Sequence, residues 1–386
     1  MPVTEQQVVE ALRPVLDPEL HISIVDLDMV KGVRVEGGRV TVTVALTVAG
    51  CPMQTELRQL VTGAVGPLDG VDDVDVDLTV MTEAELNAVR DKMRARSPRA
   101  GASGGGHGPG QARLGHEEGR PNVFMSPDNR ARVLGITSGK GGVGKSSVSV
   151  NLAVALARQG LEVGILDADV YGFSVPKMLG IDHKPVVIDD MIVPPVAFGV
   201  KCISIGFFVD DDQPVMWRGP MLHKALEQFL VDVYWGDLDY LIVDMPPGTG
   251  DVALSMAQYL PTSEVYVVTT PQAAAQRVAQ RSAYMAKKIN LPLRGVIENM
   301  SWFTGDDGKR YWLFGEGGGE SLASDLGVPL LGQVPLVPAM REGGDVGQPV
   351  SAVDPRGEAT AAFDALAGEI VARGPSRVFR PELTIR

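Results

Sequence analysis

The chain has 386 residues, of which 45% are hydrophobic, and its formal net charge is −13 at pH 7. This apolar content is enough for two hydrophobic cores, a small one and one of ordinary α/β size. The acidic balance argues against a generic nucleic-acid-binding protein, because phosphate neutralisation needs clustered Lys and Arg. The first residues lack a signal-peptide pattern, and no stretch approaches the roughly 18 apolar residues that cross a bilayer. We therefore expect a cytoplasmic protein that binds neither nucleic acid nor membranes.

Residues 1–96 predict a small α+β domain. A capping box at residues 4–7, with Thr4 and Gln7 at its ends, precedes apolar positions with helical spacing. Two β-rich segments then flank Gly37 and Gly38, which is typical of a hairpin with one buried face. The expected elements are strands at 30–35 and 40–48, a helix from about Met53, a strand at 71–80 and a helix at 82–94.

Residues 97–120 predict a flexible linker. This segment is rich in Gly, Ser, Pro and charged residues and includes three consecutive glycines, Gly104 to Gly106. Such a composition cannot bury a core. We expect the domains on its two sides to move relative to each other.

Residues 121–386 predict a larger α/β domain with a mostly parallel, doubly wound sheet. Apolar strand segments alternate here with segments of helical spacing, which indicates a sheet covered on both faces. The expected central strands are 132–137, 162–166, 240–243, 265–269 and 293–297. The expected helices are 147–158, 219–234 and 274–289.

A glycine-rich loop follows the first of these strands. Residues 139–146 read G-K-G-G-V-G-K-S and lie between a strand and a helix, where a P-loop belongs. Glycines let backbone N–H groups point at phosphates, and the helix N-terminus adds a favourable dipole. Lys145 would neutralise the β- and γ-phosphates, and Ser146 would ligate Mg²⁺. The predicted ATP-binding residues of this segment are Gly139, Lys140, Gly141, Gly142, Val143, Gly144, Lys145, Ser146 and Ser147.

Lys140 is a second lysine inside the same loop. Two lysines so close together would repel each other unless additional phosphate charge were nearby, which suggests a second subunit. The loop resembles that of the deviant Walker A ATPases, which include nitrogenase iron protein and plasmid-partition ATPases. In that family the early lysine reaches the partner's ATP. The resemblance implies a homodimer in which Lys140 and Lys145 both serve catalysis.

Carboxylates follow two of the predicted strands. Asp167 and Asp169 come after the strand at 162–166, and Asp244 ends the strand at 240–243, at the sheet edge where ligands bind in α/β folds. The resemblance implies that Asp169 orients the attacking water. Asp244 fits a Walker B position that supports Mg²⁺, and Asp167 would share either task. Since carboxylates at strand ends are also used as turn caps, that alternative stays open.

Two adenine contacts are implied by resemblance alone. Asn299 follows a predicted strand and matches the family position whose amide contacts the base. Pro335 lies in a stretch, 333–345, that resembles the loop enclosing the base. The segment 244–251 looks like the second switch of this family.

Several segments together resemble the Mrp/ApbC group of iron–sulfur cluster carriers. Those in the larger domain are 139–147, 167–174, 244–251, 298–301 and 314–319, and those in the small domain are 16–20, 24–27 and 50–52. The small domain is similar to one shared with iron–sulfur assembly factors. The resemblance implies an ATP-hydrolysing dimer that transfers iron–sulfur clusters to apoproteins and works with assembly factors.

The chain departs from this group where its members carry a Cys-x-x-Cys motif. That motif provides two thiolates per subunit for a bridging 4Fe–4S cluster, but here the matching positions are Gly305 and Gly308. Cys202 lies in an apolar run and is expected in the core. Cys51 precedes Pro52 at the start of a predicted helix, where a thiolate would be stabilised. It is therefore a possible cluster ligand, and burial as a small apolar residue is an equally open alternative.

Two other functions stay open beside the cluster carrier. One is an ATP-dependent adaptor that has no cluster of its own and regulates another assembly machine through the small domain. The other is a positioning switch like those of division-site or plasmid-partition ATPases. The C-terminal segment argues against the switch, because Pro375 and Pro381 interrupt it and it has no basic amphipathic helix for membrane binding.

Overall fold

A computed structural model describes residues 3–18, 20, 22–47, 54–96, 122–126, 129–170, 172–188, 191–209, 219–248 and 250–376. Cys51 and the predicted linker at 97–120 lie outside the described residues. The contacts divide the chain into two compact units. The first comprises Met1–Leu114 and Pro185–Pro194, and the second comprises Gly115–Lys184 and Pro195–Arg386.

The first unit contains a three-stranded sheet of order β1-β2-β3. Strand β1 (Val30–Glu36) pairs antiparallel with β2 (Arg39–Leu46) across the turn at Gly37 and Gly38, and β2 pairs parallel with β3 (Asp73–Val80). Helix α1 (Glu5–Leu12) begins with the expected capping box, and the other helices are α2 (Gln54–Val65) and α3 (Glu83–Arg96). A short antiparallel pair, β6 (Val186–Ile188) and β7 (Met191–Val193), is grouped with this unit. Val40, Val42 and Val44 of β2 are fully buried, as the alternating pattern predicts.

The second unit is built on an eight-stranded sheet of order β15-β12-β11-β4-β10-β5-β9-β8. All neighbouring strands are parallel except β8, which pairs antiparallel with β9 at one edge. The strands are β4 (Arg132–Ser138), β5 (Val163–Asp167), β8 (Val196–Ala197), β9 (Val200–Ser204), β10 (Tyr240–Asp244), β11 (Glu264–Thr269), β12 (Leu293–Glu298) and β15 (Leu330–Gln333). From β4 the chain continues to β5 on one side of β4 in the sheet, and later, after β10, it crosses to β11 on the other side of β4. A ligand crevice is therefore expected at the carboxyl end of β4.

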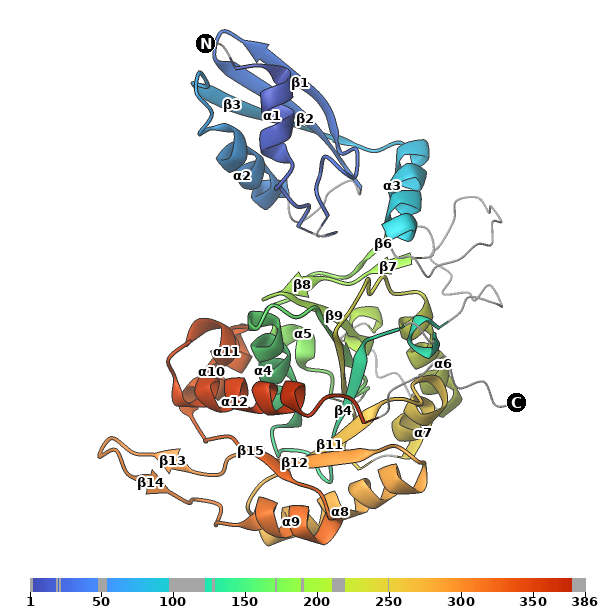
Figure 1. Cartoon of the computed structure of the whole chain (residues 1–386), viewed down its shortest axis with the longest axis vertical. Helices are drawn as coiled ribbons and strands as arrows, with labels where there is room; N and C mark the ends of the chain where they lie inside the picture. Colours follow the sequence, from blue (N-terminus) through green and yellow to red (C-terminus); the bar gives the residue numbers. More distant parts are fainter. Residues whose placement is uncertain are drawn as a thin grey trace. The chain divides into compact units, whose positions relative to one another are not determined.

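Helices cover both faces of this sheet (Figure 1). On one face α4 (Lys145–Arg158) packs against β5, β10 and α12 (Glu358–Ala372), and α5 (Val175–Met178), α10 (Pro338–Val346) and α11 (Val350–Val353) lie beside them. On the other face α8 (Ala273–Lys288) packs against β11, α7 (Gly250–Tyr259) and α9 (Gly318–Leu326), and α6 (Gly219–Val231) packs against α7. The remaining pieces are η1 (Val123–Met125), η2 (Ile205–Phe208) and a hairpin of β13 (Phe303–Thr304) and β14 (Arg310–Tyr311). This arrangement confirms the predicted mostly parallel, doubly wound fold.

The central strands form the core of the second unit because they are apolar on both faces. Every residue of β5, β10 and β11 is buried. Gly164 of β5 leaves room for an indole, since a Cβ there would lie 2.8 Å from a ring carbon of Trp235. Continuous apolar runs of this kind are what a sheet covered on both sides requires.

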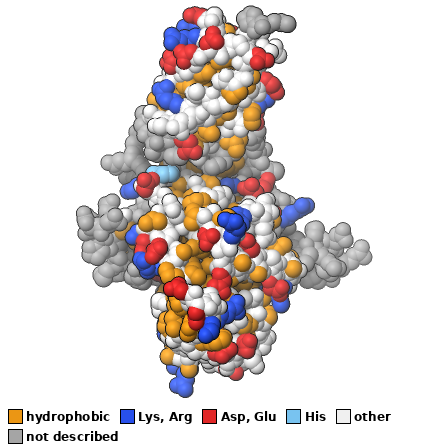
Figure 2. Space-filling view, turned by 90° about the vertical axis from the view of Figure 1, so that its left-hand side faces the viewer, with side chains coloured by type: hydrophobic (Ala, Val, Ile, Leu, Met, Phe, Trp, Pro, Cys, Tyr) orange, Lys and Arg blue, Asp and Glu red, His pale blue; other side chains and the backbone are white. Residues whose placement is uncertain are grey.

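On the face that Figure 2 shows, Lys and Arg side chains of the second unit are interspersed with Asp and Glu. Among the described residues, every helix is too short or too polar to pass through a lipid bilayer.

Candidate nucleotide site

The loop between β4 and α4 has the backbone that a phosphate-binding loop requires. Gly142 and Gly144 adopt left-handed conformations, with φ of 81° and 77°, which glycine reaches without steric cost. Gly139 is pressed against α8, since a Cβ there would lie 2.1 Å from the backbone nitrogen of Ala279. Gly144 caps α4 without a side-chain hydrogen bond. The first N–H groups of α4 are thus left for an anion.

Three side chains meet at the carboxylate of Asp244, at the end of β10. Lys145 Nζ and Ser146 Oγ each lie 2.6 Å from Asp244 Oδ2, and Ser149 Oγ donates to Asp244 Oδ1 at 2.6 Å. Asp244 is fully buried and Lys145 is 6% exposed. The sequence predicted Lys145, Ser146 and Asp244 here but missed Ser149. The spacing in the sequence could have identified Ser149, because it is four residues after Lys145 and so lies on the same face of the helix.

The donor set at this point fits a magnesium ion. The Ser146 hydroxyl and the Asp244 carboxylate are hard oxygen ligands, and Mg²⁺ is commonly bound by one or two such groups together with substrate phosphates. Both oxygens lie beside Lys145, whose ammonium group faces the same carboxylate. The residues present would thus hold Mg²⁺ next to the phosphates.

Asp167 organises the loop that follows β5. Its Oδ1 accepts a hydrogen bond from Asp169 N, and its Oδ2 accepts bonds from Ser174 N, Val175 N and Ser204 Oγ, at 3.1 to 3.2 Å. Complete burial and the nearby charge of Asp244 raise the pKa of Asp167 to about 7, against the opposing effect of Lys145. Its contacts make Asp167 a positioning residue for the loop. The suggested role in holding Mg²⁺ stays a prediction.

This loop brings Asp169 close to Lys145. Its Oδ2 lies 3.6 Å from Lys145 Nζ, and the residue is 8% exposed. Asp169, Lys145 and Asp244 therefore share one site, as the sequence predicted, although they come from three separate segments.

The segment after β10 is bonded directly to the glycine loop. Gly248 N donates to Ser138 O at 2.9 Å, and a Cβ on Gly248 would lie 3.3 Å from Gly139 O. Gly248 itself has φ of 70°. Thr249 lies outside the described residues. The segment after β10 is thus in direct contact with the start of the glycine loop, and its role as the second switch stays a prediction.

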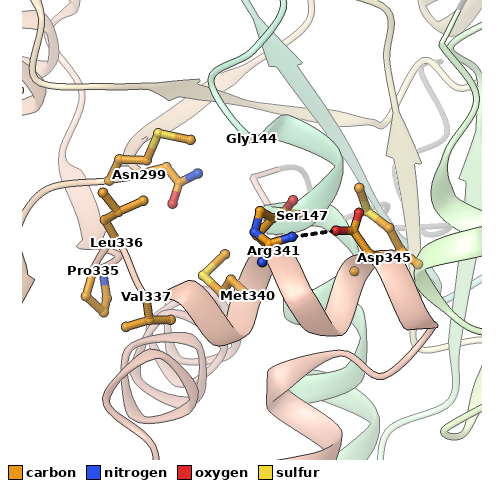
Figure 3. Close-up of a pocket in the computed structure, with 12 residues that line it drawn as sticks. Gly144, Ser147, Asn299, Pro335, Leu336, Val337, Met340, Arg341 and Asp345 are labelled. Atoms are coloured by element: carbon orange, nitrogen blue, oxygen red, sulfur yellow. Dashed lines mark hydrogen bonds and ion pairs between the residues drawn. The ribbon is translucent and has the colours of Figure 1, made fainter.

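A cavity of about 250 Å³ opens beside the N-terminus of α4 (Figure 3). It includes the predicted base contacts Asn299 and Pro335, and the full lining is Gly144, Ser147, Met178, Asn299, Met300, Pro335, Leu336, Val337, Met340, Arg341, Gly344 and Asp345. The lining is mostly apolar, with polar groups at a few points, as in sites for flat aromatic ligands. The sequence did not predict the three methionines.

Asn299 presents one free acceptor to this cavity. Its Nδ2 donates to Val143 O at 2.9 Å, which fixes the amide against the glycine loop. Its Oδ1 is buried without a hydrogen-bond partner among the described residues and faces the open space in Figure 3. A buried orphan acceptor is costly unless a ligand satisfies it. The amino group of adenine is a donor that would fit.

Glu298 fixes the turn that carries Asn299. Its Oε1 accepts hydrogen bonds from Ser301 Oγ and Gln333 Nε2, both at 2.8 Å, and its Oε2 accepts one from Gly319 N. Glu298 is 1% exposed. One carboxylate thereby ties the turn that carries Asn299 to β15 and to the start of α9. Glu298 was not among the predicted site residues, although a charged residue that ends an apolar strand is a signal for a buried polar role.

Lys140 is the second residue of the glycine loop and is partly exposed. Its carbonyl accepts a hydrogen bond from Ser138 Oγ at 3.1 Å. Within the described part of the chain, its Nζ has no ion-pair or hydrogen-bond partner. An available ammonium group is compatible with the predicted reach to a second subunit, which stays a prediction.

The positions where cysteines were expected form a tight turn. Gly308 N donates to Gly305 O and Gly305 N donates to Lys309 O, both at 2.9 Å, at the tip of the β13–β14 hairpin. Cys202 in β9 is fully buried, and burial raises the pKa of its thiol. Among the described residues no group of three or more His, Cys, Asp or Glu side chains could hold a metal ion. The predicted ligand Cys51 lies outside those residues.

The sheet, the glycine loop at its central strand and the Lys145–Asp244 pair define a P-loop NTPase. Residues 129–371 match the family described as NUBPL iron-transfer P-loop NTPase, and residues 5–94 match the family described as iron-sulfur cluster assembly protein. The chain belongs to this family of iron–sulfur cluster carriers, which confirms the resemblance found in the sequence.

Relatives of similar organisation carry the same description. The chain is 47% identical to an iron-sulfur cluster carrier protein of Mycobacterium leprae over 348 residues, covering 88% of this chain and 85% of the relative. It is 40% identical to that of the cyanobacterium Synechocystis, covering 96% and 98%. Among solved structures, a nucleotide-binding protein of Archaeoglobus fulgidus in complex with ADP is similar, with a TM-score of 0.53 and 32% identity over 63% of this chain and 98% of that one.

Proposed function

We propose that this protein binds and hydrolyses Mg·ATP and uses the cycle to carry iron–sulfur clusters to apoproteins. One observation carries the ATPase part: Lys145, Ser146 and Ser149 converge on the buried carboxylate of Asp244 beside an open helix N-terminus. Bound Mg²⁺ would neutralise charge on the β- and γ-phosphates. Lys145 would hold those phosphates, and Ser146 and Asp244 would fix the ion.

ATP is favoured over GTP by the orientation of Asn299. Its Nδ2 is occupied by Val143 O, so only Oδ1 can meet the base. Adenine offers an amino hydrogen at that point, whereas guanine offers a carbonyl oxygen. Two acceptors facing each other leave a buried group unpaired, which costs about 1–3 kcal/mol. We expect GTP to bind about ten- to a hundredfold more weakly than ATP.

Asp169 is proposed to orient the attacking water. It lies 3.6 Å from Lys145 Nζ, so a water held by its carboxylate would be near the phosphates. Its loop is anchored by Asp167, which accepts hydrogen bonds from the backbone N–H groups of Asp169 and Val175. Asp169→Asn should retain ATP binding and lose most of the turnover.

The active form is proposed to be a homodimer in which Lys140 contacts the partner's ATP. Lys145→Ala should abolish ATP binding and hydrolysis. Lys140→Ala should keep ATP binding in a titration but lose the dependence of turnover on protein concentration. Equal loss of ATP binding in both variants would refute the shared-nucleotide dimer.

The cluster is proposed to be held between Cys51 of two subunits, with the remaining ligands from a client protein or small thiols. Cys202 is too deeply buried to contribute, and Gly305 and Gly308 offer no ligand atoms. Buried, reduced Cys202 fits the reducing cytoplasm, which we propose as the compartment. The test is anaerobic reconstitution with iron and sulfide, followed by transfer to an apoprotein.

Cys202→Ser is the matched control for Cys51→Ser in that experiment. We expect cluster absorbance and client activation in the wild type and in Cys202→Ser, and neither in Cys51→Ser. If the wild type binds no cluster while ATP turnover is intact, the carrier role is wrong. The turn at Gly305 and Gly308 then favours the second candidate, an ATP-dependent adaptor without a cluster of its own, which affinity purification with Asp169→Ala would test.

A further inference from the structure

Methionines form an unusual share of the wall of the base cavity. Met178, Met300 and Met340 are three of its twelve lining residues, whereas methionine accounts for 15 of the 386 residues of the chain. They come from three separate segments, namely α5, the turn after β12 and α10. All three side chains are partly exposed, and Figure 3 shows the Met340 side chain among the labelled lining residues.

The methionines lie next to residues that we assign to nucleotide binding or that line the same cavity. Met300 follows Asn299 and has φ of 57°, and its Cε lies 3.5 Å from where a Cβ on Gly144 would be. Met178 Cγ lies 3.8 Å from the corresponding position on Gly344 of α10. A change in the polarity of these side chains would therefore act on the turn with Asn299 and on the contact between α5 and α10.

Thioethers contact aromatic rings favourably, and they are also readily oxidised. Hydrogen peroxide transfers one oxygen to the sulfur: an S–O bond forms, the O–O bond breaks, the sulfur loses two electrons and water leaves. The product is a polar sulfoxide in place of a flexible apolar group. In the base cavity the sulfoxide oxygen would put a strong acceptor against the ring and take up space that the apolar side chain leaves free.

We propose that Met178, Met300 and Met340 are a peroxide-sensitive modification site that lowers ATP affinity when oxidised. The inference rests on the proposed ATP-binding function, since the cavity is assigned to the base. It goes beyond that function because oxidation would reversibly lower the affinity of the protein for ATP. Methionine sulfoxide reductases, using a dithiol as reductant, would restore the thioethers and the affinity.

The experiment compares ATP affinity before and after peroxide treatment of the full-length protein. Sulfoxides are located by peptide mass spectrometry, and ATP affinity is measured by calorimetry. In the wild type we expect about tenfold weaker binding after oxidation, because a polar group replaces an apolar one against the base. Treatment with the two sulfoxide reductases and a dithiol reductant, which is oxidised to a disulfide as water leaves, should reverse this loss.

Two combined variants separate the cavity from other methionines. The readout is the ratio of affinities before and after peroxide, so any change in starting affinity cancels. The variant Met178→Leu, Met300→Leu, Met340→Leu should give a ratio near one. The control Met125→Leu, Met221→Leu removes methionines that are 55% and 47% exposed elsewhere and should behave like the wild type.

Three outcomes would overturn the proposal. These are sulfoxides at the cavity methionines with unchanged ATP affinity, the absence of oxidation at all three, or an equal loss in the cavity variant and the wild type. If the triple variant does not fold, Met340→Leu alone should give a smaller ratio than the wild type. Failure of the untreated wild type to bind ATP is a separate result, which refutes the proposed function itself.

Discussion

Asp244→Asn removes one charge of the buried pair at the centre of the site and keeps its volume. In the wild type Asp244 Oδ2 accepts bonds from Lys145 Nζ and Ser146 Oγ, and Oδ1 accepts one from Ser149 Oγ. The asparagine retains one acceptor oxygen and turns a donor group towards one of these hydroxyls or the ammonium. Lys145 is 6% exposed, and its remaining ion-pair partner among the described residues is Asp169, 3.6 Å away.

The expected loss of stability follows from this geometry. Removing one partner of a buried ion pair costs about 3–5 kcal/mol, because the remaining charge is uncompensated. The carboxylate of Asp169 still compensates part of the Lys145 charge. We therefore expect a loss in the free energy of unfolding at the lower end of this range, about 3 kcal/mol, in the absence of nucleotide. Mg·ATP should offset part of this loss, because its phosphates supply negative charge to Lys145.

The assay is urea unfolding followed by tryptophan fluorescence. All four tryptophans of the chain belong to the second unit, so the signal reports on that unit alone. The control Asp364→Asn breaks the partly exposed Arg158–Asp364 pair and should cost less than about 1 kcal/mol. If Asp244→Asn is as stable as this control, and its ATP affinity keeps the same Mg²⁺ dependence as the wild type, the account of the site is refuted.

Three further predictions follow from the surroundings of the site. Gly144→Ala should weaken ATP binding at least tenfold in calorimetry, because its φ is 77° and a Cβ would lie 2.3 Å from Asn299 Nδ2. The control is Gly368→Ala in α12, where a Cβ would meet nothing within 4 Å, and equal effects of the two changes would contradict the packing described. Glu298→Gln should lower urea stability by about 1–3 kcal/mol and raise the Kd for ATP, whereas the exposed Asp325→Asn should do neither; an unchanged Kd would show that Glu298 does not position Asn299. The folded-state pKa of Asp167 is raised to about 7, so between about pH 4 and pH 7 the folded protein holds a proton that the unfolded chain has lost. The free energy of unfolding without nucleotide should therefore fall over this range by up to about 1.4 kcal/mol per pH unit. The same slope in Asp167→Asn would refute this assignment.

The sequence predicted the parts of the fold that local patterns determine. The five central strands are apolar on both faces, and the observed strands extend the expected ranges by one residue or start within one residue of them. The capping box at Thr4 and the turn at Gly37 and Gly38 depend on neighbouring residues only, and both are present. The predicted boundaries of the two domains and the linker stay predictions.

Other elements were not predicted because tertiary contacts decide them. Strands β6, β7 and β8 have two or three residues each, too few for a periodic pattern. Helix α12 is rich in alanine and has no clear apolar stripe, so its position is decided by its packing against α4. The contact of Asp167 with Ser204 joins residues 37 positions apart, and no spacing rule brings them together. The glycine loop could be predicted because one continuous segment contains it, whereas the base cavity is assembled from distant segments.

The most direct test of this account is a calorimetric titration of the purified full-length protein with Mg·ATP. The convergence of Lys145 and Ser146 on Asp244, beside an orphan acceptor on Asn299, predicts saturable binding that requires Mg²⁺, prefers ATP to GTP and is lost in Lys145→Ala. If the folded wild-type protein gives no heat on titration with Mg·ATP, and ADP competes with no bound nucleotide, the predicted nucleotide site is contradicted.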